Sequence, residues 1–214
     1  RKYRMNISRL KDLPVGLHDK LNELVRKYFI VGGMPAVVKE YISTRDIAKC
    51  QQIQHSIIDT YIDDFAKYSK TSSHVYLRKV FNAVPGMIGQ KFVYSRVDRE
   101  TKSRELKAAL ERLETAGIVT RVRQTSGSGL PLSSGVHESF FKVIFLDVGL
   151  VHAISGIYKE SAIVEDLTTI FKGAVAEQFA GQELIVYQAC YKRSELFYWG
   201  RKERSSTAEV DYLL

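Results

Sequence analysis

The sequence predicts an α+β fold, with a mostly helical N-terminal half that contains a winged-helix-like unit, followed by a truncated α/β unit. Three observations predict this class. Apolar residues recur at three- and four-residue intervals as far as residue 68. A helix, a turn, a second helix and a strand are then expected within residues 75–122. Most of the strand-like runs come after residue 117, and the last residues of the chain lie within one of them.

Three helices are expected in the first 68 residues. The first carries apolar residues at helical spacing between Leu17 and Phe29, and Gly32-Gly33 is a natural stop for it. The second begins at Met34-Pro35, because proline suits the first position of a helix. The third and longest is expected from about Asp46 to Tyr68.

The middle of the chain has the element order of a winged helix. Residues 75–84 suit a helix, and residues 91–97, KFVYSRV, are expected to form a short extended stretch. The next helix begins at Ser103 and places its apolar residues on one side, with Gly117 at its C-terminal cap. A strand is expected over residues 118–122. Its alternation, IVTRV, completes the helix–turn–helix–strand order.

A glycine- and serine-rich stretch separates this unit from the α/β unit. Residues 124–139 predict a mobile loop or a long wing tip. Beyond it we expect a strand over residues 141–146 and a short helix entered at Asp147. A longer helix over residues 171–191 and the strands ELFYW and AEVDYLL complete the chain. The expected units are therefore 1–45, 46–140 and 141–214.

The charge of the chain is concentrated in its middle. The formal net charge is +8, and the segment from Lys67 to Arg123 holds 13 Lys and Arg against 5 Asp and Glu, which accounts for the whole excess. A concentrated basic patch indicates a polyanionic partner, most commonly nucleic acid. We therefore predict phosphate contacts from Lys91, Arg96, Arg99, Lys102, Arg104, Lys107, Arg112, Arg121 and Arg123.

An alternative for the same segment is a solvated helix in a module that packs or binds a partner protein. Glu105, Glu111 and Glu114 lie on the helix that begins at Ser103, and they would repel phosphate. Charge alone therefore leaves both interpretations open.

Two acidic residues in the second half suggest a metal site. Glu177 shares a helical face with small and apolar neighbours, and Asp211 lies in a strand between Val210 and Tyr212. A helix carboxylate beside a strand carboxylate can begin a Mg²⁺ site, because this cation needs several oxygen ligands. The alternative is that Glu177 pairs with a nearby base and that Asp211 ends a surface strand.

Other chemistry finds no support in the sequence. It contains no GxxxxGK[ST] phosphate loop, no HExxH pair and no GxSxG motif. It also has no apolar run of the length that spans a membrane, so no membrane partner is expected. Cys50 and Cys190 are interpreted as two separate reduced side chains, which favours a cytoplasmic location.

Six segments together resemble one family over nearly the whole chain. They are YFIVGGMPAVVKEY, FNAVPGMIGQKFVYS, SRELKAALERLETAGIV, KVIFLDVGLVHAISG, GAVAEQFAGQEL and FYWGRKERSSTAEVDYLL. The chain resembles the C-terminal region of prokaryotic AAA-type (P-loop) ATPases that carry a C-terminal domain of unknown function related to restriction-endonuclease-like nucleases.

This resemblance implies that the chain is a fragment. ATP and Mg²⁺ would bind to a core upstream of Arg1, so residues 1–45 would be the helical end of the ATPase domain or a linker, without ATPase activity. Residues 141–214 would be a truncated nuclease-like unit in which Glu177 and Asp211 match the helix glutamate and the strand aspartate. A Glu-x-Lys on the next strand would complete a Mg²⁺ site, and nothing here matches it.

Three functions follow as expectations. The first is a nucleic-acid-associated region with DNA and the missing ATPase domain as partners. The second is a protein-interaction or assembly module that couples to the ATPase domain, suggested by the GGMP junction at residues 32–35. The third is the remnant of a metal-dependent nuclease, which would be inactive in this fragment.

Overall fold

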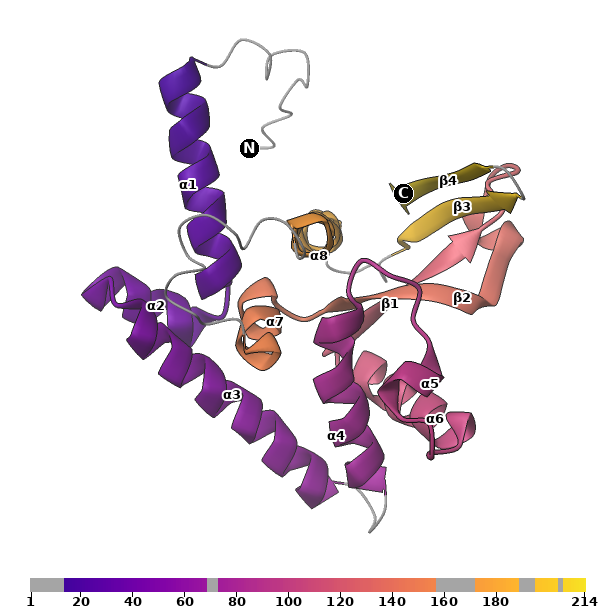
Figure 1. The fold of residues 1–214 in the computed structure, drawn as a ribbon, viewed down its shortest axis with the longest axis horizontal. Coiled ribbons are helices and arrows are strands. Elements are labelled where there is room, and N and C mark those ends of the chain that lie inside the picture. Colours follow the sequence, from indigo (N-terminus) through magenta and orange to yellow (C-terminus); the bar gives the residue numbers. More distant parts are fainter. Residues whose placement is uncertain (1–13, 69–72, 157–171, 189–194, 204–205) are drawn as a thin grey trace.

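Helices pack against two strands on one face of a four-stranded sheet, and among the residues that the structure describes one long helix packs on the other face. The computed structural model describes residues 14–68, 73–156, 172–188, 195–203 and 206–214. Its helices dominate the first half, and a mixed sheet occupies the second, as Figure 1 shows. The expected α+β class is confirmed.

The three expected N-terminal helices are present. They are α1 (Val15–Val31), α2 (Pro35–Thr44) and α3 (Ile47–Tyr68). Helix α1 ends at Gly32, whose φ of 72° is the left-handed conformation that favours glycine. Helix α2 packs against α3 through Val37 and Cys50, which are both buried, whereas Cys190 lies outside the described residues.

A winged-helix order follows in α4 (Ser73–Ala83), the 3-10 turn η2 (Val84–Met87), α5 (Tyr94–Val97), α6 (Ser103–Thr115), β1 (Val119–Thr125), η3 (Leu132–Gly135) and β2 (Val136–Phe145). The apolar side of α6 is buried as expected, and Gly117 follows the helix with a φ of 73°. Helices α4 and α6 pack together through Phe81, Leu106 and Leu110.

The extended stretch expected over residues 91–97 is only partly correct. Tyr94–Val97 forms the helical turn α5, and extended backbone is confined to the residues before it. Within that shorter stretch, Phe92 N donates to Phe141 O of β2 at 2.9 Å. Residues 94–97 close a helical turn instead, in which Arg96 N donates to Val93 O at 3.0 Å and Asp98 N donates to Tyr94 O at 3.3 Å. An alternating side-chain pattern does not reveal these backbone hydrogen bonds.

The glycine- and serine-rich loop is shorter than expected. Gln124 and Thr125 belong to β1 and pair with His137 and Val136 of β2, so the connection spans residues 126–135. Thr125 Oγ1 donates to Leu132 O at 2.8 Å and closes the base of this loop. The hairpin β1–β2 therefore extends well beyond the strands predicted at 118–122 and 141–146.

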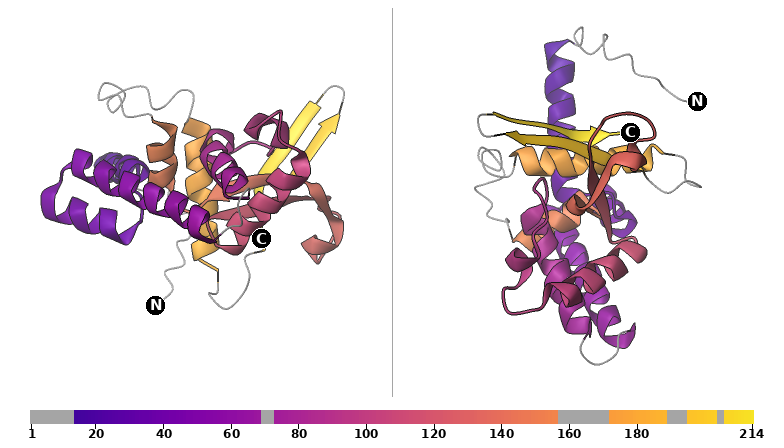
Figure 2. Two further views of the ribbon diagram at one scale, coloured as in Figure 1. Left: turned by 90° about the horizontal axis from the view of Figure 1, so that it is seen from below. Right: turned by 90° about the vertical axis from the view of Figure 1, so that its right-hand side faces the viewer.

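The sheet continues across the boundary expected between residues 140 and 141. Its order is β2-β1-β3-β4, with β3 (Phe197–Glu203) parallel to β1 and β4 (Ser206–Leu213) antiparallel to β3. Helix α8 (Lys172–Val186) lies beside β3 and β4 in both views of Figure 2. Residues 171 and 189–191 of the expected helix lie outside the described residues.

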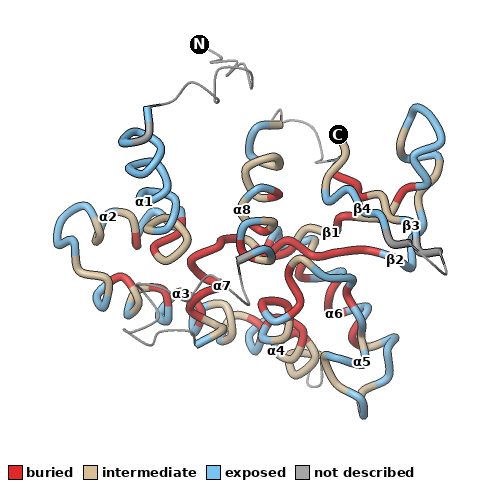
Figure 3. Tube along the Cα trace, turned by 45° about the horizontal axis from the view of Figure 1, so that its top comes forward, coloured by how far each residue is buried: buried red, intermediate tan, exposed pale blue. Residues whose placement is uncertain are grey.

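Two clusters of apolar residues cover the two faces of β2. The larger one joins α3, α4 and α6 to Phe141, Val143 and Phe145. The smaller one gathers Ile144 of β2 with Val122, Leu196 and Tyr198 under α8. Figure 3 shows the buried residues concentrated along β2 and α7 (Val148–Ser155), whereas α1 is largely exposed.

Asp147 connects the N-terminal helices to the sheet. It caps α7 (Val148–Ser155) by accepting from Leu150 N at 3.0 Å, as expected for the residue that enters this helix. Its other oxygen accepts from Gly33 N at 2.7 Å. A Cβ at Gly32 would lie 2.2 Å from Asp147 Oδ1, so the paired glycines allow the α1–α2 turn to reach this carboxylate.

Candidate functional site

A buried lysine on β2 lies among the acidic residues that the sequence singled out. Lys142 lies between Phe141 and Val143, which pack into the helical core, so its own side chain faces α8. That side chain is only 4% exposed. Burying an ammonium group costs free energy unless the group is paired with an opposite charge. Lys142 is paired with three carboxylates.

Three carboxylates surround this ammonium. Lys142 Nζ donates to Glu177 Oε1 at 2.8 Å and to Asp211 Oδ1 at 3.0 Å. It also forms an ion pair with Glu209. Glu209 and Asp211 lie two residues apart on β4, so they share one side of the strand. We call Lys142 with these three residues the carboxylate cluster.

The structure thus brings together the two predicted residues, Glu177 and Asp211, and adds two that the sequence analysis missed. Lys142 is a single charge within the apolar run FFKVIF, which is a signal that a buried partner exists. Glu209 precedes Asp211 by two residues, so strand periodicity could have placed it on the same side.

Helix α8 is positioned by its own polar and small residues. Gln178 donates from Nε2 to Phe145 O at 2.7 Å and accepts from Phe145 N at 2.9 Å, which satisfies the backbone of this edge strand. A Cβ at Gly181 would lie 2.4 Å from the Ile144 side chain, so only glycine allows this close approach. Close packing of α8 then brings Glu177 to Lys142.

Burial sets the ionisation of this cluster. It raises the pKa of Glu177, and the nearby Lys142 ammonium offsets part of that rise. Burial alone would lower the pKa of Lys142, but hydrogen bonds to Glu177, Glu209 and Asp211 outweigh it and raise the pKa. Lys142 therefore stays charged throughout the neutral range.

Two tyrosines surround the cluster. Burial raises the pKa of Tyr212, whose hydroxyl donates to Glu177 O at 2.8 Å. Burial also raises the pKa of Tyr198 to about 12, and its ring centroid lies 5.4 Å from Lys142 Nζ. Both side chains are neutral at physiological pH, so the charges of the cluster come from Lys142 and the carboxylates.

The predicted metal site at Glu177 and Asp211 meets an obstacle in this geometry. Carboxylate oxygens are suitable ligands for Mg²⁺. However, Lys142 Nζ occupies the position between the carboxylates. Within the described ranges, no group of three or more His, Cys, Asp or Glu residues is arranged to hold a metal ion. As arranged, the residues do not fit a metal ion, and its binding here stays a prediction.

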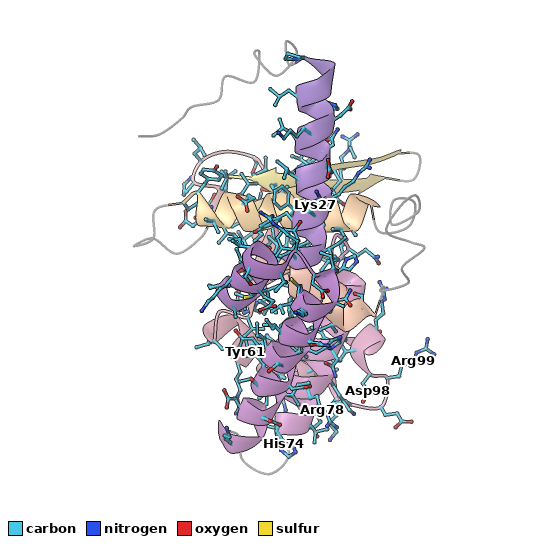
Figure 4. All side chains as sticks on the ribbon, turned by 90° about the vertical axis from the view of Figure 1, so that its left-hand side faces the viewer. Lys27, Tyr61, His74, Arg78, Asp98 and Arg99 are labelled. Carbon is cyan, nitrogen blue, oxygen red and sulfur yellow. The ribbon has the colours of Figure 1, made fainter. Side chains whose placement is uncertain are left out.

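Exposed cations gather on α5, on the turn after it and on α6. We call these residues the basic surface: Arg96, Arg99, Lys102, Arg104, Lys107 and Arg112. All six are exposed, and for Arg104, Lys107 and Arg112 this is what the apolar pattern of α6 predicted. Arg96 and Arg99 line a shallow hollow with Ser95, Val97 and Asp98. Figure 4 shows Arg99 extending outward beyond Asp98.

Asp98 fixes the turn that carries these cations. Its carboxylate accepts from Thr101 Oγ1 at 2.6 Å and from Glu100 N at 3.0 Å, and it forms an ion pair with Lys79. Hydrogen bonds from Lys79 and then Thr101 hold the pKa of Asp98 well below its usual range. The only acid that lines the hollow is therefore already neutralised by a cation of α4.

Arg121 and Arg123 are held in ion pairs, although the sequence grouped them with the residues of the basic surface. Arg121 Nε donates to Glu114 Oε2 at 2.7 Å, and the arginine side chain is only 10% exposed. Arg123 Nε donates to Glu138 Oε2 at 3.0 Å. The ion pair with Arg121 also neutralises Glu114, one of the acids expected to repel phosphate.

Lys91 is an exposed residue beside two aromatic rings. Its Nζ lies 6.0 Å from the ring centroid of Phe140 and 5.9 Å from that of Tyr198. The neighbouring Gln90 accepts from Arg96 Nη1 at 2.7 Å. Lys91 thus extends the line of cations from α5 toward β2.

No described helix combines the length and apolar character that crossing a bilayer requires. Neither the comparison with curated proteins nor the one with solved structures finds a match.

A comparison with family models matches residues 22–161 to a domain of unknown function, DUF8612. The match includes Lys142 and the basic surface, and it ends before α8 and β4, which supply the three carboxylates. It describes no activity, so the ATPase parent and the relationship to nucleases stay predictions. Because the matched range covers more than half of the chain, this protein belongs to the DUF8612 family.

Proposed function

We propose that the winged-helix-like unit binds nucleic acid by contacting phosphates with its basic surface. The observation that carries this proposal is a difference between two groups of the predicted phosphate contacts. Arg121 and Arg123 are held in ion pairs with acids, whereas the six cations of the basic surface are exposed. Exposed cations are the ones that can neutralise phosphates and release counterions.

The shape of the unit supports the same proposal. Helix α6 has 13 residues, which at 1.5 Å per residue gives a length of about 20 Å. Its apolar residues face α4, so Arg104, Lys107 and Arg112 lie on the exposed side of the helix, where a partner can reach them. In a winged helix, such a helix enters the major groove, and the β1–β2 hairpin would be the wing.

The acids of α6 weaken this surface only partly. Glu105 pairs with Arg104 at 3.2 Å, and both side chains are exposed enough for solvent to screen the interaction. A phosphate can therefore compete for Arg104. Glu111 is an exposed acid on the same helix, so we expect moderate affinity that depends strongly on salt.

Binding can be tested by fluorescence anisotropy with labelled 20-base-pair DNA at low ionic strength. The informative variant combines Arg99→Gln, Arg104→Gln and Lys107→Gln. Its matched control, Lys39→Gln, removes an exposed cation on α2, away from the basic surface. We expect the triple variant to lose most of the affinity and the control to retain it. Absence of salt-sensitive binding by the unaltered chain would contradict the proposal.

The exposed side of α1 favours a second candidate, in which this helix docks against another protein domain. Leu17, Leu21 and Leu24 are 43%, 43% and 51% exposed, and they follow one another at helical spacing. Figure 1 shows α1 extending away from the rest of the protein. Such a surface suits coupling to the ATPase domain that the family resemblance implies.

Hydrogen exchange tests this second candidate. In a longer chain that includes the implied ATPase domain, amides of α1 should exchange more slowly than in residues 1–214, and ATP should alter their exchange. Identical exchange in both chains, with and without ATP, would exclude the coupling. We propose no catalytic step for the carboxylate cluster, because Lys142 fills the position between its carboxylates.

A further inference from the structure

Phe140 is an aromatic residue of β2 that joins neither apolar core. Its side chain is 53% exposed, whereas the next residue, Phe141, is 4% exposed. The ladder between β1 and β2 shifts register at this point, since Arg123 pairs with Phe141 and Gln124 pairs with His137. Residues 138–140 therefore form a bulge, and bulges change the direction of side chains. Here the bulge leaves the ring of Phe140 on the surface.

A cation lies beside this exposed ring. Lys91 Nζ is 6.0 Å from the Phe140 centroid, and Lys91 is itself exposed. On another side, the His137 ring meets Phe140 edge-on with centroids 6.4 Å apart. A single exposed aromatic residue is ordinary on protein surfaces. A ring accompanied by an exposed ammonium is a more specific arrangement, because the pair offers a flat apolar face and a positive charge together.

This pair is continuous with the basic surface. Arg96 Nη1 donates to the side chain of Gln90, the residue next to Lys91. Arg96 also lines the hollow with Arg99. Cations thus follow one another from Arg99 through Arg96 to Lys91, and the line ends at Phe140. A backbone of phosphates bound along these cations would place a nucleotide over the Phe140 ring.

In a duplex the bases stack on one another and are not available to an outside ring. An exposed aromatic ring beside phosphate-binding cations is instead how proteins hold unpaired nucleotides. We infer that the nucleic acid bound by this chain contains an unpaired nucleotide, whose base stacks on Phe140 and whose phosphate contacts Lys91. This inference rests on the proposed function and specifies its substrate class as single-stranded nucleic acid or a duplex with an unpaired end.

Three labelled DNAs of one sequence test the inference with the whole chain. They are a 20-nucleotide single strand, the blunt duplex and the same duplex with an unpaired tail. We expect the single strand and the tailed duplex to bind about tenfold more tightly than the blunt duplex. Phe140→Ala should abolish this preference, because it weakens binding of the single strand and of the tailed duplex and leaves binding of the blunt duplex unchanged. Phe140→Trp should keep it, because a larger ring also stacks.

A second measurement reports stacking directly. Wild-type protein should quench the fluorescence of 2-aminopurine placed in the single strand, and Phe140→Ala should reduce that quenching at saturating protein. Thermal unfolding of both Phe140 variants should match the wild type, since the ring is half exposed and lies outside both cores. This control separates a loss of stacking from a loss of folding.

The outcomes distinguish this inference from the proposed function. If the blunt duplex binds as tightly as the single strand and Phe140→Ala changes nothing, the inference is wrong and phosphate binding by the basic surface stands. If none of the three DNAs binds at low salt, the proposed function fails, and the inference fails with it.

Discussion

The ammonium of Lys142 on β2 lies 2.8 Å from the carboxylate of Glu177 on α8 and joins these two elements inside the protein. Glu177 is 14% exposed, so the pair lies mostly out of water. Asp211 and Glu209 contact the same ammonium from β4. One lysine thus connects β2 with a helix and a strand that lie 35 and 69 residues further along the chain.

Replacing this lysine should destabilise the protein strongly. Lys142→Met leaves the buried Glu177 carboxylate without its partner, which typically costs about 3–5 kcal/mol. Urea unfolding measures the loss. In the Lys142→Met, Glu177→Gln double variant, part of the stability should return, because the buried carboxylate is gone and the remaining Glu209 and Asp211 are 40% and 58% exposed to solvent. The exposed Lys39→Met is the matched control and should change the free energy of unfolding by less than about 0.5 kcal/mol. A loss as small as this for Lys142→Met would show that the cluster does not hold α8 in place.

Substituting Arg121 and Arg99 by glutamine should have opposite effects on stability and on nucleic-acid binding. Arg121→Gln removes a largely buried partner of Glu114 and should cost about 1–3 kcal/mol of stability. Arg99→Gln, on the exposed turn, should leave stability unchanged and weaken nucleic-acid binding. Unfolding and anisotropy measured on both variants check this division. Loss of binding without loss of stability in Arg121→Gln would place that residue back among the phosphate contacts.

Asp98 should make stability depend on pH in the acid range. Its pKa in the folded protein is lowered from the ordinary value of 3.8 by hydrogen bonds from Lys79 and Thr101. The folded state therefore binds fewer protons at this site than the unfolded state, so stability rises with pH. The stability that the ionised Asp98 carboxylate contributes is fully present above about pH 4. It is lost as the pH falls through the pKa that Asp98 has in the folded protein.

Thermal unfolding of the wild type and of Asp98→Asn between pH 2 and pH 7 tests this. The wild type should be the more stable of the two near neutral pH, and the difference should shrink toward pH 2. A difference that does not vary with pH would mean that the Asp98 carboxylate is not ionised against Lys79.

The α1–α2 turn should accept only glycine at residue 32. Gly32→Ala forces a side chain onto a φ of 72° and against Asp147 Oδ1, so it should cost more than about 1 kcal/mol. Gly16→Ala is the matched control, since a Cβ there meets nothing within 4 Å on α1. This second change should not destabilise the protein, because Gly16 lies in the first turn of α1 and alanine fits there without a clash. Chemical unfolding measures both, and equal effects would contradict the described turn.

Local patterns predicted much of this fold. The apolar spacing of α6 correctly places Leu106, Leu110 and Leu113 in the core, and Asp147 begins α7 as expected. These features depend on residues within a few positions of one another. Residues 94–97 were harder, because their turn is closed by backbone hydrogen bonds to Val93 O and Tyr94 O, which the alternation of side chains does not predict.

The candidate sites depend on contacts between distant segments. The roles of Lys142 and Glu209 appear only when α8 and β4 pack beside β2. Glu114 and Arg121 are seven residues apart, yet a charge count treats them as independent. The sequence therefore predicts where charge accumulates, and the packing decides which charges face a partner.

The salt dependence of nucleic-acid binding tests the central claim most directly. For duplex DNA, the logarithm of the association constant falls with the logarithm of salt concentration by about 0.9 for each phosphate neutralised. We predict a steep negative slope for the wild type and for Lys39→Gln. For Arg99→Gln, Arg104→Gln and Lys107→Gln together, the slope should be shallower by about 3. A slope that the three substitutions leave unchanged would show that the basic surface does not contact phosphates.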